Sequence, residues 1–295
     1  MNASPSPTQL VLCADDYAMD AAVSAGILSL ARLRRISATS VMALSPRWAA
    51  DAPALRELRD ALDVGLHLDW TSAFAQAAGH GATLGALMTR AVLASLDARK
   101  TQQHITDAIE RQLDAFEAHW QRAPDHVDGH QHVHQFAGIR QPLLTVLQRR
   151  YGAHASRPWL RVSQVAQPGI KAHVISAWGA QALQGAAHDL RWPIVGPLVG
   201  VYDFDATEGI YARHMQQWLR HLPAQALMMC HPAQAQTTAV VQDNSVTQED
   251  PIRPARLREW AYLQSDAFAH DLHSAGVQLV RGTSLTTPHN AQVMA

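Results

Sequence analysis

The sequence predicts an α/β fold, a single (β/α) barrel-like domain with about seven parallel strands. Short apolar runs alternate along the chain with helical patterns of about 10 to 15 residues, which is typical of βαβ units around a parallel sheet. No linker or shift in composition divides the 295 residues, so one domain is favoured over two. Apolar residues make up 47% of the chain and charged residues 17%, a balance typical of a protein with a buried core.

The first half of the chain predicts four strands with helices between them. Apolar runs predict strands at 9–14, 38–44, 63–68 and 124–129. Apolar residues at helical spacing predict a helix at 20–33, and Pro46 suits the opening of a helix that continues through residue 58. The small, Gly-rich residues 71–83 predict a loop, and helical patterns follow at 84–95 and 101–121.

The second half predicts the remaining strands and a long C-terminal helix. Strands are expected at 158–162, 226–231 and 277–280, and helices at 140–151, 207–221 and 254–275. Residues 163–200 mix Pro and Gly with apolar residues and give no clear pattern, and a polar loop is expected from 232 to about 251. We therefore divide the chain into a flexible N-terminus (1–8), one folded domain (9–282) and a C-terminal tail (283–295).

Charge and apolar patterning argue against several classes of partner. Lys and Arg total 24 against 25 Asp and Glu, so no basic surplus favours nucleic acid or an anionic membrane surface. No run of 18 apolar residues predicts a membrane span, and the first residues lack the pattern of a signal peptide. Cys13 and Cys230 are the only cysteines, which excludes a disulfide framework and favours reduced thiols in a cytoplasmic protein.

Acidic and histidine residues follow several of the predicted strands. In parallel α/β folds, ligands bind at the carboxyl ends of the strands, and a barrel brings these ends together. The residues at these ends are Asp15, Asp16, His67, Asp69, Asp128, His130 and His231. We therefore expect a site at this edge that is built from segments more than 200 positions apart in sequence.

Each of these residues also has a structural interpretation. Asp15 and Asp16 suit a carboxylate metal ligand beside a base, but two acids before a helix also serve as caps. His67 taken alone would be interpreted as a hydrogen-bonded structural residue. Asp69, two residues later and on the same face of the strand, favours a binding or catalytic site instead. His231 before Pro232 suits either a proton donor or a structural histidine at the end of a strand.

The segment from His126 to His134 has the densest pattern. Alternate residues of an extended chain face one way, so positions 126, 128, 130, 132 and 134 would place four more imidazoles around Asp128. A solvated face without function is one interpretation. A cation bound by imidazole and carboxylate accounts better for the pattern, with His132 and His134 near the ligands or the substrate.

Five segments together resemble the YdjC-like carbohydrate deacetylases, the ChbG/HpnK family. They are residues 14–17 (Ala-Asp-Asp-Tyr), Thr39-Ser40, 64–68 (Val-Gly-Leu-His-Leu), 126–134 (His-Val-Asp-Gly-His-Gln-His-Val-His) and 229–232 (Met-Cys-His-Pro). They occur in the family's order, and the resemblance runs from about residue 9 to 282. Tyr17 stands where the family more often has Phe.

The resemblance implies a barrel-like fold of the glycoside hydrolase/deacetylase type, and it implies an activity. The family removes acetyl groups from N-acetylated sugars through a metal-activated water, with Mg²⁺ as the usual cation and Zn²⁺ or another divalent ion as the alternative. It makes Asp16, His67 and His130 the metal ligands, Asp15 the base and His231 the acid. Asp69, Asp128, His132 and His134 are then expected to bind substrate or support the ligands.

Two other functions stay open at this stage. A metal-dependent phosphoesterase also uses His and Asp clusters, although such sites need more carboxylates and hold two or three metals. A sugar- or metal-binding protein without catalysis would have no need of a paired base and acid. For the enzyme we expect a small acetylated sugar or oligosaccharide as the substrate, and no nucleic acid as a partner. The family resemblance also implies that the protein can form a homo-oligomer.

Overall fold

The computed structural model describes residues 7–93, 98–167, 169–204, 207, 209–235 and 250–286. Its strands are β1 (Thr8–Tyr17), β2 (Ala38–Val41), β3 (Asp63–Leu68), β4 (His126–Gly129), β5 (Trp159–Arg161), β6 (Ile194–Val195), β7 (Leu198–Val199), β8 (Gln225–Cys230) and β9 (Val277–Leu279). Its α-helices are α1 (Ala21–Arg32), α2 (Trp48–Arg56), α3 (Ala73–Ala77), α4 (Leu84–Leu93), α5 (Ala98–Trp120), α6 (Ala137–Tyr151), α7 (Ile170–Ala177), α8 (Ala180–Asp189), α9 (Ile210–Arg220), α10 (Arg253–Leu263), α11 (Asp266–Ser274) and α12 (Gly282–Thr286). A short 3₁₀ helix, η1 (His130–Gln135), follows β4.

The strands form one parallel sheet that curls into a barrel-like structure. The order is β6-β5-β4-β3-β2-β1-β8-β7, and β9 pairs with the first residues of β1. Only Gly196 and Pro197 separate β6, which pairs with β5, from β7, which pairs with β8. The two ends of the sheet are therefore joined by one continuous stretch of chain, and the predicted fold class is confirmed.

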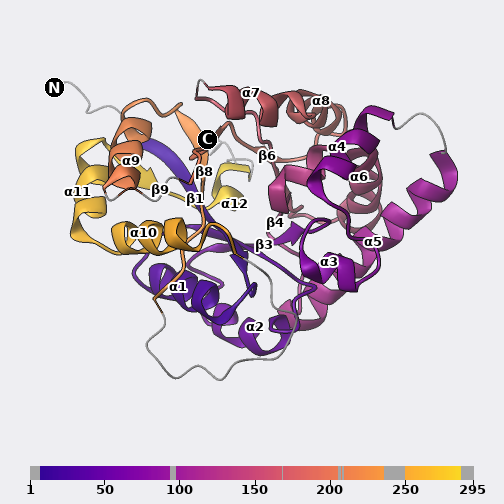
Figure 1. The fold of residues 1–295 in the computed structure, drawn as a ribbon, viewed down its shortest axis with the longest axis horizontal. Helices are drawn as coiled ribbons and strands as arrows, with labels where there is room; N and C mark the ends of the chain where they lie inside the picture. The colour runs from indigo at the N-terminus through magenta and orange to yellow at the C-terminus, as the bar shows by residue number, and fades with distance from the viewer. Residues whose placement is uncertain are drawn as a thin grey trace, which may run out of the picture.

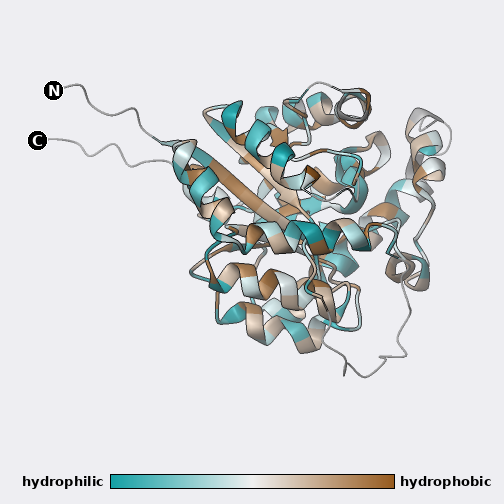
Figure 2. Ribbon diagram, turned by 60° about the vertical axis from the view of Figure 1, so that its left-hand side comes forward, coloured by the Kyte–Doolittle hydropathy of each residue, from teal (hydrophilic) through white to brown (hydrophobic). Residues whose placement is uncertain are grey.

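Helices surround the strands on all sides (Figure 1). Leu10, Leu12 and Ala14 of β1 pack outward in the large core with the helices, whereas Val11 and Cys13 pack inward with Trp159 and Leu227. This alternation follows from the two-residue period of a strand. Hydrophobic residues dominate the strands and the helices carry mixed faces (Figure 2). The helices therefore bury their apolar sides against the sheet.

Several predicted segments differ from the structure. The predicted loop 71–83 contains α3, because Ser72 accepts hydrogen bonds from two backbone N–H groups and so caps a short helix. The predicted helix 254–275 is two helices, because the chain turns at Gln264 and Ser265 then caps α11. The unassigned segment 163–200 contains α7, α8, β6 and β7, and α12 extends the folded part into the predicted tail. Residues 1–6, 94–95, 236–249 and 287–295 of the predicted segments lie outside the described residues.

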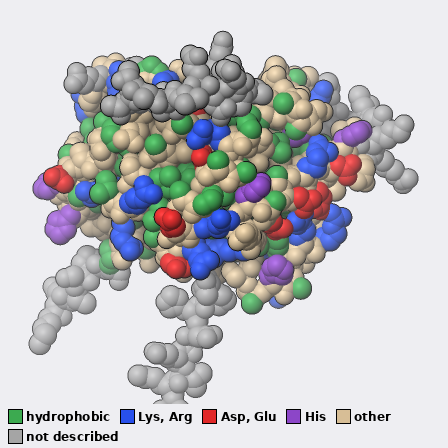
Figure 3. Space-filling model, turned by 90° about the horizontal axis from the view of Figure 1, so that it is seen from below, with side chains coloured by type: hydrophobic (Ala, Val, Ile, Leu, Met, Phe, Trp, Pro, Cys, Tyr) green, Lys and Arg blue, Asp and Glu red, His purple; other side chains and the backbone are tan. Residues whose placement is uncertain are grey.

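The surface carries charges of both signs. On the face shown in Figure 3, basic and acidic side chains lie near one another among hydrophobic and uncharged ones. This distribution agrees with the net charge of −1. Within the described parts of the chain, no helix combines the length and the apolar character that crossing a membrane requires.

Candidate metal centre

The end of β1 places two adjacent carboxylates in the same site. Two neighbours in a regular strand point to opposite faces, but the pairing of β1 with β2 shifts register between Ala14 and Tyr17. Asp16 lies in this irregular stretch with a φ of 73°. Both Asp15 and Asp16 are buried, at 2% and 1% exposure, and neither caps α1, because Asp20 accepts the capping hydrogen bond from Val23. The capping interpretation of this pair is therefore wrong.

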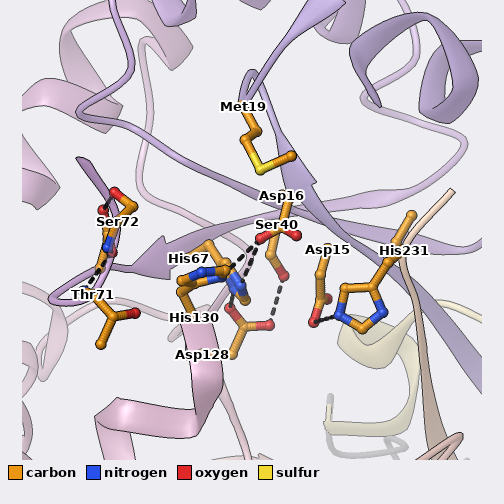
Figure 4. A network of polar contacts seen from close by, with 12 residues as sticks. Asp15, Asp16, Met19, Ser40, His67, Thr71, Ser72, Asp128, His130 and His231 are labelled. Atoms are coloured by element: carbon orange, nitrogen blue, oxygen red, sulfur yellow. Dashed lines mark hydrogen bonds and ion pairs between the residues drawn. The ribbon is translucent and has the colours of Figure 1, made fainter. Parts of the chain in front are cut away.

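Asp16, His67 and His130 lie together at the carboxyl ends of β1, β3 and β4 (Figure 4). The Oδ1 atom of Asp16 is 3.0 Å from Nδ1 of His130 and 3.4 Å from Nε2 of His67. One ligand atom from each residue lies within 4.8 Å of the others, a spacing that suits a shared cation. His130 is partly exposed, so this group can be reached from solvent.

Two other groups of potential ligands lie nearby, one formed by Cys13, His126 and Asp128 and one by Asp15, His67 and Asp128. Their carboxylates are already occupied. Asp128 binds His67 through Oδ1 and both Ser40 and Arg161 through Oδ2, and both oxygens of Asp15 bind Arg161. Asp16 therefore offers the carboxylate oxygen best placed for a metal.

Asp128 orients the ring of His67. Its Oδ1 atom is 2.6 Å from Nδ1 of His67, which leaves Nε2 turned toward Asp16. A carboxylate bound to the far nitrogen of a histidine is the usual support of a metal-binding imidazole. Ser40 donates a hydrogen bond to the other oxygen at 2.6 Å, and Arg161 lies 2.5 Å from that oxygen. Asp128 thus supports His67 rather than standing among the ligands.

Asp15 faces His231 across the mouth of the site (Figure 4). Arg161 donates hydrogen bonds to both oxygens of Asp15, at 2.7 and 2.6 Å. Nε2 of His231 lies 3.8 Å from Oδ2 of Asp15, and the backbone N–H of His231 donates to Glu259 at 2.5 Å. Asp15 and His231, which the family resemblance makes the base and the acid, are therefore held beside each other by groups on β5 and α10.

The charges of the site explain the pKa shifts of its residues. Burial acts to lower the pKa of His67, but the carboxylates of Asp128, Asp15 and Asp16 together outweigh burial and raise the pKa to about 10. Burial acts to raise the pKa of Asp16, but Arg256 and His130 hold it well below its usual value. Burial lowers the pKa of His231 to about 4 in spite of the opposing charge of Asp15. His231 is therefore neutral at pH 7.

The histidine-rich segment does not continue as a strand. β4 ends at Gly129, and Gln131 and His132 take left-handed backbone angles inside η1, with φ of 53° and 60°. The predicted alternation therefore fails beyond residue 129. His132 shares a hydrogen bond with Ser163, and His134 shares one with the carbonyl of Arg161.

His126 and Asp69 also have structural partners. His126 is fully buried, stacks on Trp159 with ring centroids 4.2 Å apart and shares a hydrogen bond with Ser40. Asp69 follows the end of β3 and accepts hydrogen bonds from the backbone of Thr71 and Ser72. Its carboxylate therefore stabilises the turn before α3, which differs from the predicted role beside His67.

Sequence reasoning missed Arg161, Arg256 and Glu259. Arg161 and Glu259 are fully buried and Arg256 is 2% exposed. An arginine inside the apolar run Trp159–Val162 was the available signal for Arg161, because a buried charge requires partners. Arg256 and Glu259 lie on a helix of mixed composition, and no local pattern marks them.

A cavity of about 950 Å³ lies between the turn at residues 78–81 and the helices α4, α5 and α6. Its lining includes Trp70 and Phe136, which follow β3 and η1 directly. Asp16, His67 and His130 are not among the residues that line it. The cavity is therefore not part of the candidate metal centre.

Comparisons with known proteins agree on one family. The family model described as YdjC-like protein matches residues 9–274. A carbohydrate deacetylase of Mus musculus is 31% identical over 159 residues, which are 50% of this chain and 50% of that protein. A carbohydrate deacetylase of Homo sapiens is 30% identical over 159 residues, 50% of this chain and 48% of that protein. The match thus spans about half the length of these curated relatives.

A solved structure from Enterococcus faecalis shares the fold. That protein carries the name of a proposed cellobiose-phosphate cleavage protein. It superimposes with a TM-score of 0.66 and 21% identity, over 95% of this chain and 100% of the other.

Proposed function

Because the chain belongs to the YdjC-like family, we propose that it is a metal-dependent hydrolase that removes acetyl groups from N-acetylated sugars. The observation that carries the proposal is the joint placement of Asp16, His67 and His130 beside the facing pair Asp15 and His231. Hydrolysis of an amide needs a polarised carbonyl, a base for water and an acid for the leaving nitrogen. This group of residues can meet all three needs.

Two imidazoles and one carboxylate fit a divalent cation with open coordination positions. Asp16, His67 and His130 would hold it. When bound, such a cation acts as a Lewis acid toward the acetyl carbonyl and lowers the pKa of water. The family resemblance implies Mg²⁺, whereas imidazole-rich donor sets suit Zn²⁺ and other transition metals. We therefore compare these cations in the experiment below.

Asp15 and His231 would move the protons. Arg161 binds both oxygens of Asp15, which keeps that carboxylate ionised and fixed in direction. Asp15 then accepts a proton from the attacking water. His231 is neutral at rest and 3.8 Å from Asp15, so it can take up this proton and donate it to the departing nitrogen. General acid and base catalysis of this kind contributes about 10²- to 10⁴-fold in rate.

We further propose a cytoplasmic location and an acetylated sugar or oligosaccharide as the substrate. Cys13 and Cys230 are both buried and unpaired, as expected in a reducing compartment. The names of the curated relatives support the carbohydrate class of substrate.

The first test is release of acetate from a panel of N-acetylated oligosaccharides. The enzyme is stripped with a chelator and reloaded with Mg²⁺, Zn²⁺, Co²⁺ or Mn²⁺, and bound metal is counted per chain. We expect chelation to abolish activity and one cation per chain to restore it. Two or three cations per chain with phosphate release from phosphoesters would favour the phosphoesterase instead.

The matched variant is His130→Ala, which removes a proposed ligand that is partly exposed and so tolerates replacement. We expect loss of both metal binding and acetate release. His273→Ala, an exposed histidine on α11, serves as the control and should retain both. Full activity of His130→Ala would overturn the assignment of the ligands.

A further inference from the structure

Helix α10 directs a buried arginine at the proposed metal ligand Asp16. Nη2 of Arg256 donates a hydrogen bond to Oδ2 of Asp16 at 2.7 Å, and its Nε donates to Asp250 at 3.1 Å. The side chain is almost fully buried, at 3% exposure. A guanidinium shielded from water in this way acts at close to its full charge.

The two oxygens of Asp16 therefore face different partners. Oδ2 is held by Arg256, whereas Oδ1 lies 3.0 Å from Nδ1 of His130 and 3.4 Å from Nε2 of His67. Asp16 also has a backbone φ of 73°, which is uncommon for a residue with a side chain. The guanidinium therefore holds the carboxylate with one oxygen toward the imidazoles.

Attachment of α10 to the barrel does not require this contact. Arg253, one turn earlier on the same helix, binds Asp20 at the start of α1 and also binds Asp250. The α10 residue Glu259 binds the end of β8. Anchoring is thus supplied by other residues, and the direction of Arg256 into the site needs its own explanation.

We propose that Arg256 is a positioning residue that restricts Asp16 to one metal-facing oxygen and weakens the hold of the site on its cation. The proposal rests on the metal centre described above. A divalent cation and a guanidinium on the two oxygens of one carboxylate repel each other. The site would then bind a cation less tightly, and the partial neutralisation of Asp16 by Arg256 would leave that cation a stronger Lewis acid toward the substrate carbonyl.

Two substitutions with opposite expected effects test the proposal. Arg256→Gln removes the charge and keeps a hydrogen-bond donor, so the affinity for Zn²⁺ or Co²⁺ should rise by about tenfold or more. Asp250→Asn frees the arginine from its other partner and concentrates its charge on Asp16, so the affinity should fall by a similar factor. Arg256→Lys keeps the charge and should stay within about threefold of the wild type. Isothermal titration calorimetry with the metal alone measures all four proteins.

Turnover at saturating metal gives the second readout. Arg256→Gln should bind metal more tightly and yet lower kcat by about tenfold or more, because the cation is less strongly polarising and Asp16 is less well held. Arg258→Gln is the matched control on the same helix, since Arg258 donates a hydrogen bond to the carbonyl of Pro254, and both quantities should stay near wild-type values.

The outcomes separate this inference from the proposed function. A merely structural Arg256 would loosen the site, so Arg256→Gln and Asp250→Asn would both weaken metal binding, and this result would overturn the proposal. If Arg256→Gln does not fold, equal or tighter binding by Asp250→Asn would overturn it. A wild-type protein that binds no cation would remove the metal centre itself, whereas wild-type binding with unchanged variants would remove only the role of Arg256.

Discussion

Asp15 and Asp16 are adjacent in sequence, but their carboxylates have separate partners. Arg161 holds the first and Arg256 the second, and His231 and His130 stand on the side of each that faces the site. Three carboxylates, counting Asp128, meet two guanidinium groups and the ring of His67, whose pKa the carboxylates raise to about 10. A cation that replaces the proton of His67 would therefore meet one net negative charge. Such a cluster attracts a cation without the repulsion that three unpaired acids would create.

At the residue scale we predict that Asp128→Asn weakens metal binding by about 10- to 100-fold, because His67 loses the carboxylate that fixes its ring. Calorimetric titration with Zn²⁺ gives the affinity. Asp107→Asn, on the exposed face of α5, is the control. An unchanged affinity in Asp128→Asn would contradict the supporting role of Asp128.

Local sequence predicted the imidazoles and carboxylates better than their partners. Asp16, His67 and His130 follow strands, and the carboxyl ends of parallel strands meet at one edge, so their proximity could be inferred from position. Arg161 and Arg256 could not be inferred as partners, because an arginine reaches over a long side chain and its acid lies 146 or 240 positions away. The supporting charges of the site are therefore visible only in three dimensions.

At the element scale, the short strands β3 and β4 leave little space inside the barrel. Gly65 of β3 lies against the ring of His126 from β4, and a Cβ at this position would overlap that ring. His126 cannot move aside easily, because it is fully buried and stacks on Trp159. The ring of His126 can therefore occupy its position only because residue 65 is a glycine.

We therefore predict that Gly65→Ala destabilises the protein by about 1–3 kcal/mol, the usual cost of overpacking. Gly185→Ala is the matched control, since it adds the same methyl group in the middle of α8 with no atom within 4 Å. It should stabilise the protein by about 0.5–1 kcal/mol, because Ala favours a helix more than Gly does. Urea unfolding measures both. Equal stabilities of the two variants would show that the barrel interior can expand.

The two-residue periodicity of the histidine-rich segment from His126 to His134 predicts side-chain directions only as far as the strand continues. A two-residue repeat is meaningful only while the chain is extended, and β4 ends at Gly129. Left-handed angles at Gln131 and His132 then send the following imidazoles in different directions. The pattern of alternating histidines was therefore wrong in placing His132 and His134 on the face of Asp128, whereas the site that it predicts stays a prediction.

At the scale of the whole molecule, α10 couples the stability of the barrel to pH. Burial raises the pKa of Glu259 to about 7 from the ordinary value of 4.5. The folded state thus binds this proton more tightly than the unfolded state, so the contribution of Glu259 to stability is fully present below pH 4.5 and is lost as the pH rises through 7. Its hydrogen bonds from Tyr202 and from the backbone of His231 only partly offset the burial of the charge.

We predict that Glu259→Gln removes this pH dependence. The wild type should lose on the order of 3 kcal/mol of unfolding free energy through Glu259 between pH 4.5 and 7, whereas the variant should not. Urea unfolding at pH 5 and pH 7.5 compares the two proteins, and the difference between their slopes isolates this residue. Parallel slopes would show that Glu259 keeps an ordinary pKa.

The alternation of strands and helices was sufficient to predict the barrel-like class. The way the sheet closes was not predictable, because β6 and β7 are two residues each and lie in a segment without clear periodicity. Their pairing depends on β5, on β8 and on the residues after β5, where the backbone N–H of Leu198 donates to the carbonyl of Gln164. Short elements of this kind are specified by the rest of the fold rather than by their own residues.

The central place of β1 has a consequence for how the chain is made. Residues 8–17 are synthesised before the other strands of the sheet, yet they pair with β8 at residue 225 onward and with β9 at residue 277 onward. At about 5–20 residues per second, synthesis takes tens of seconds to supply these partners. During that interval one edge of an apolar strand stays open to other nascent chains, and a cell that makes this protein quickly would need chaperones to cover it.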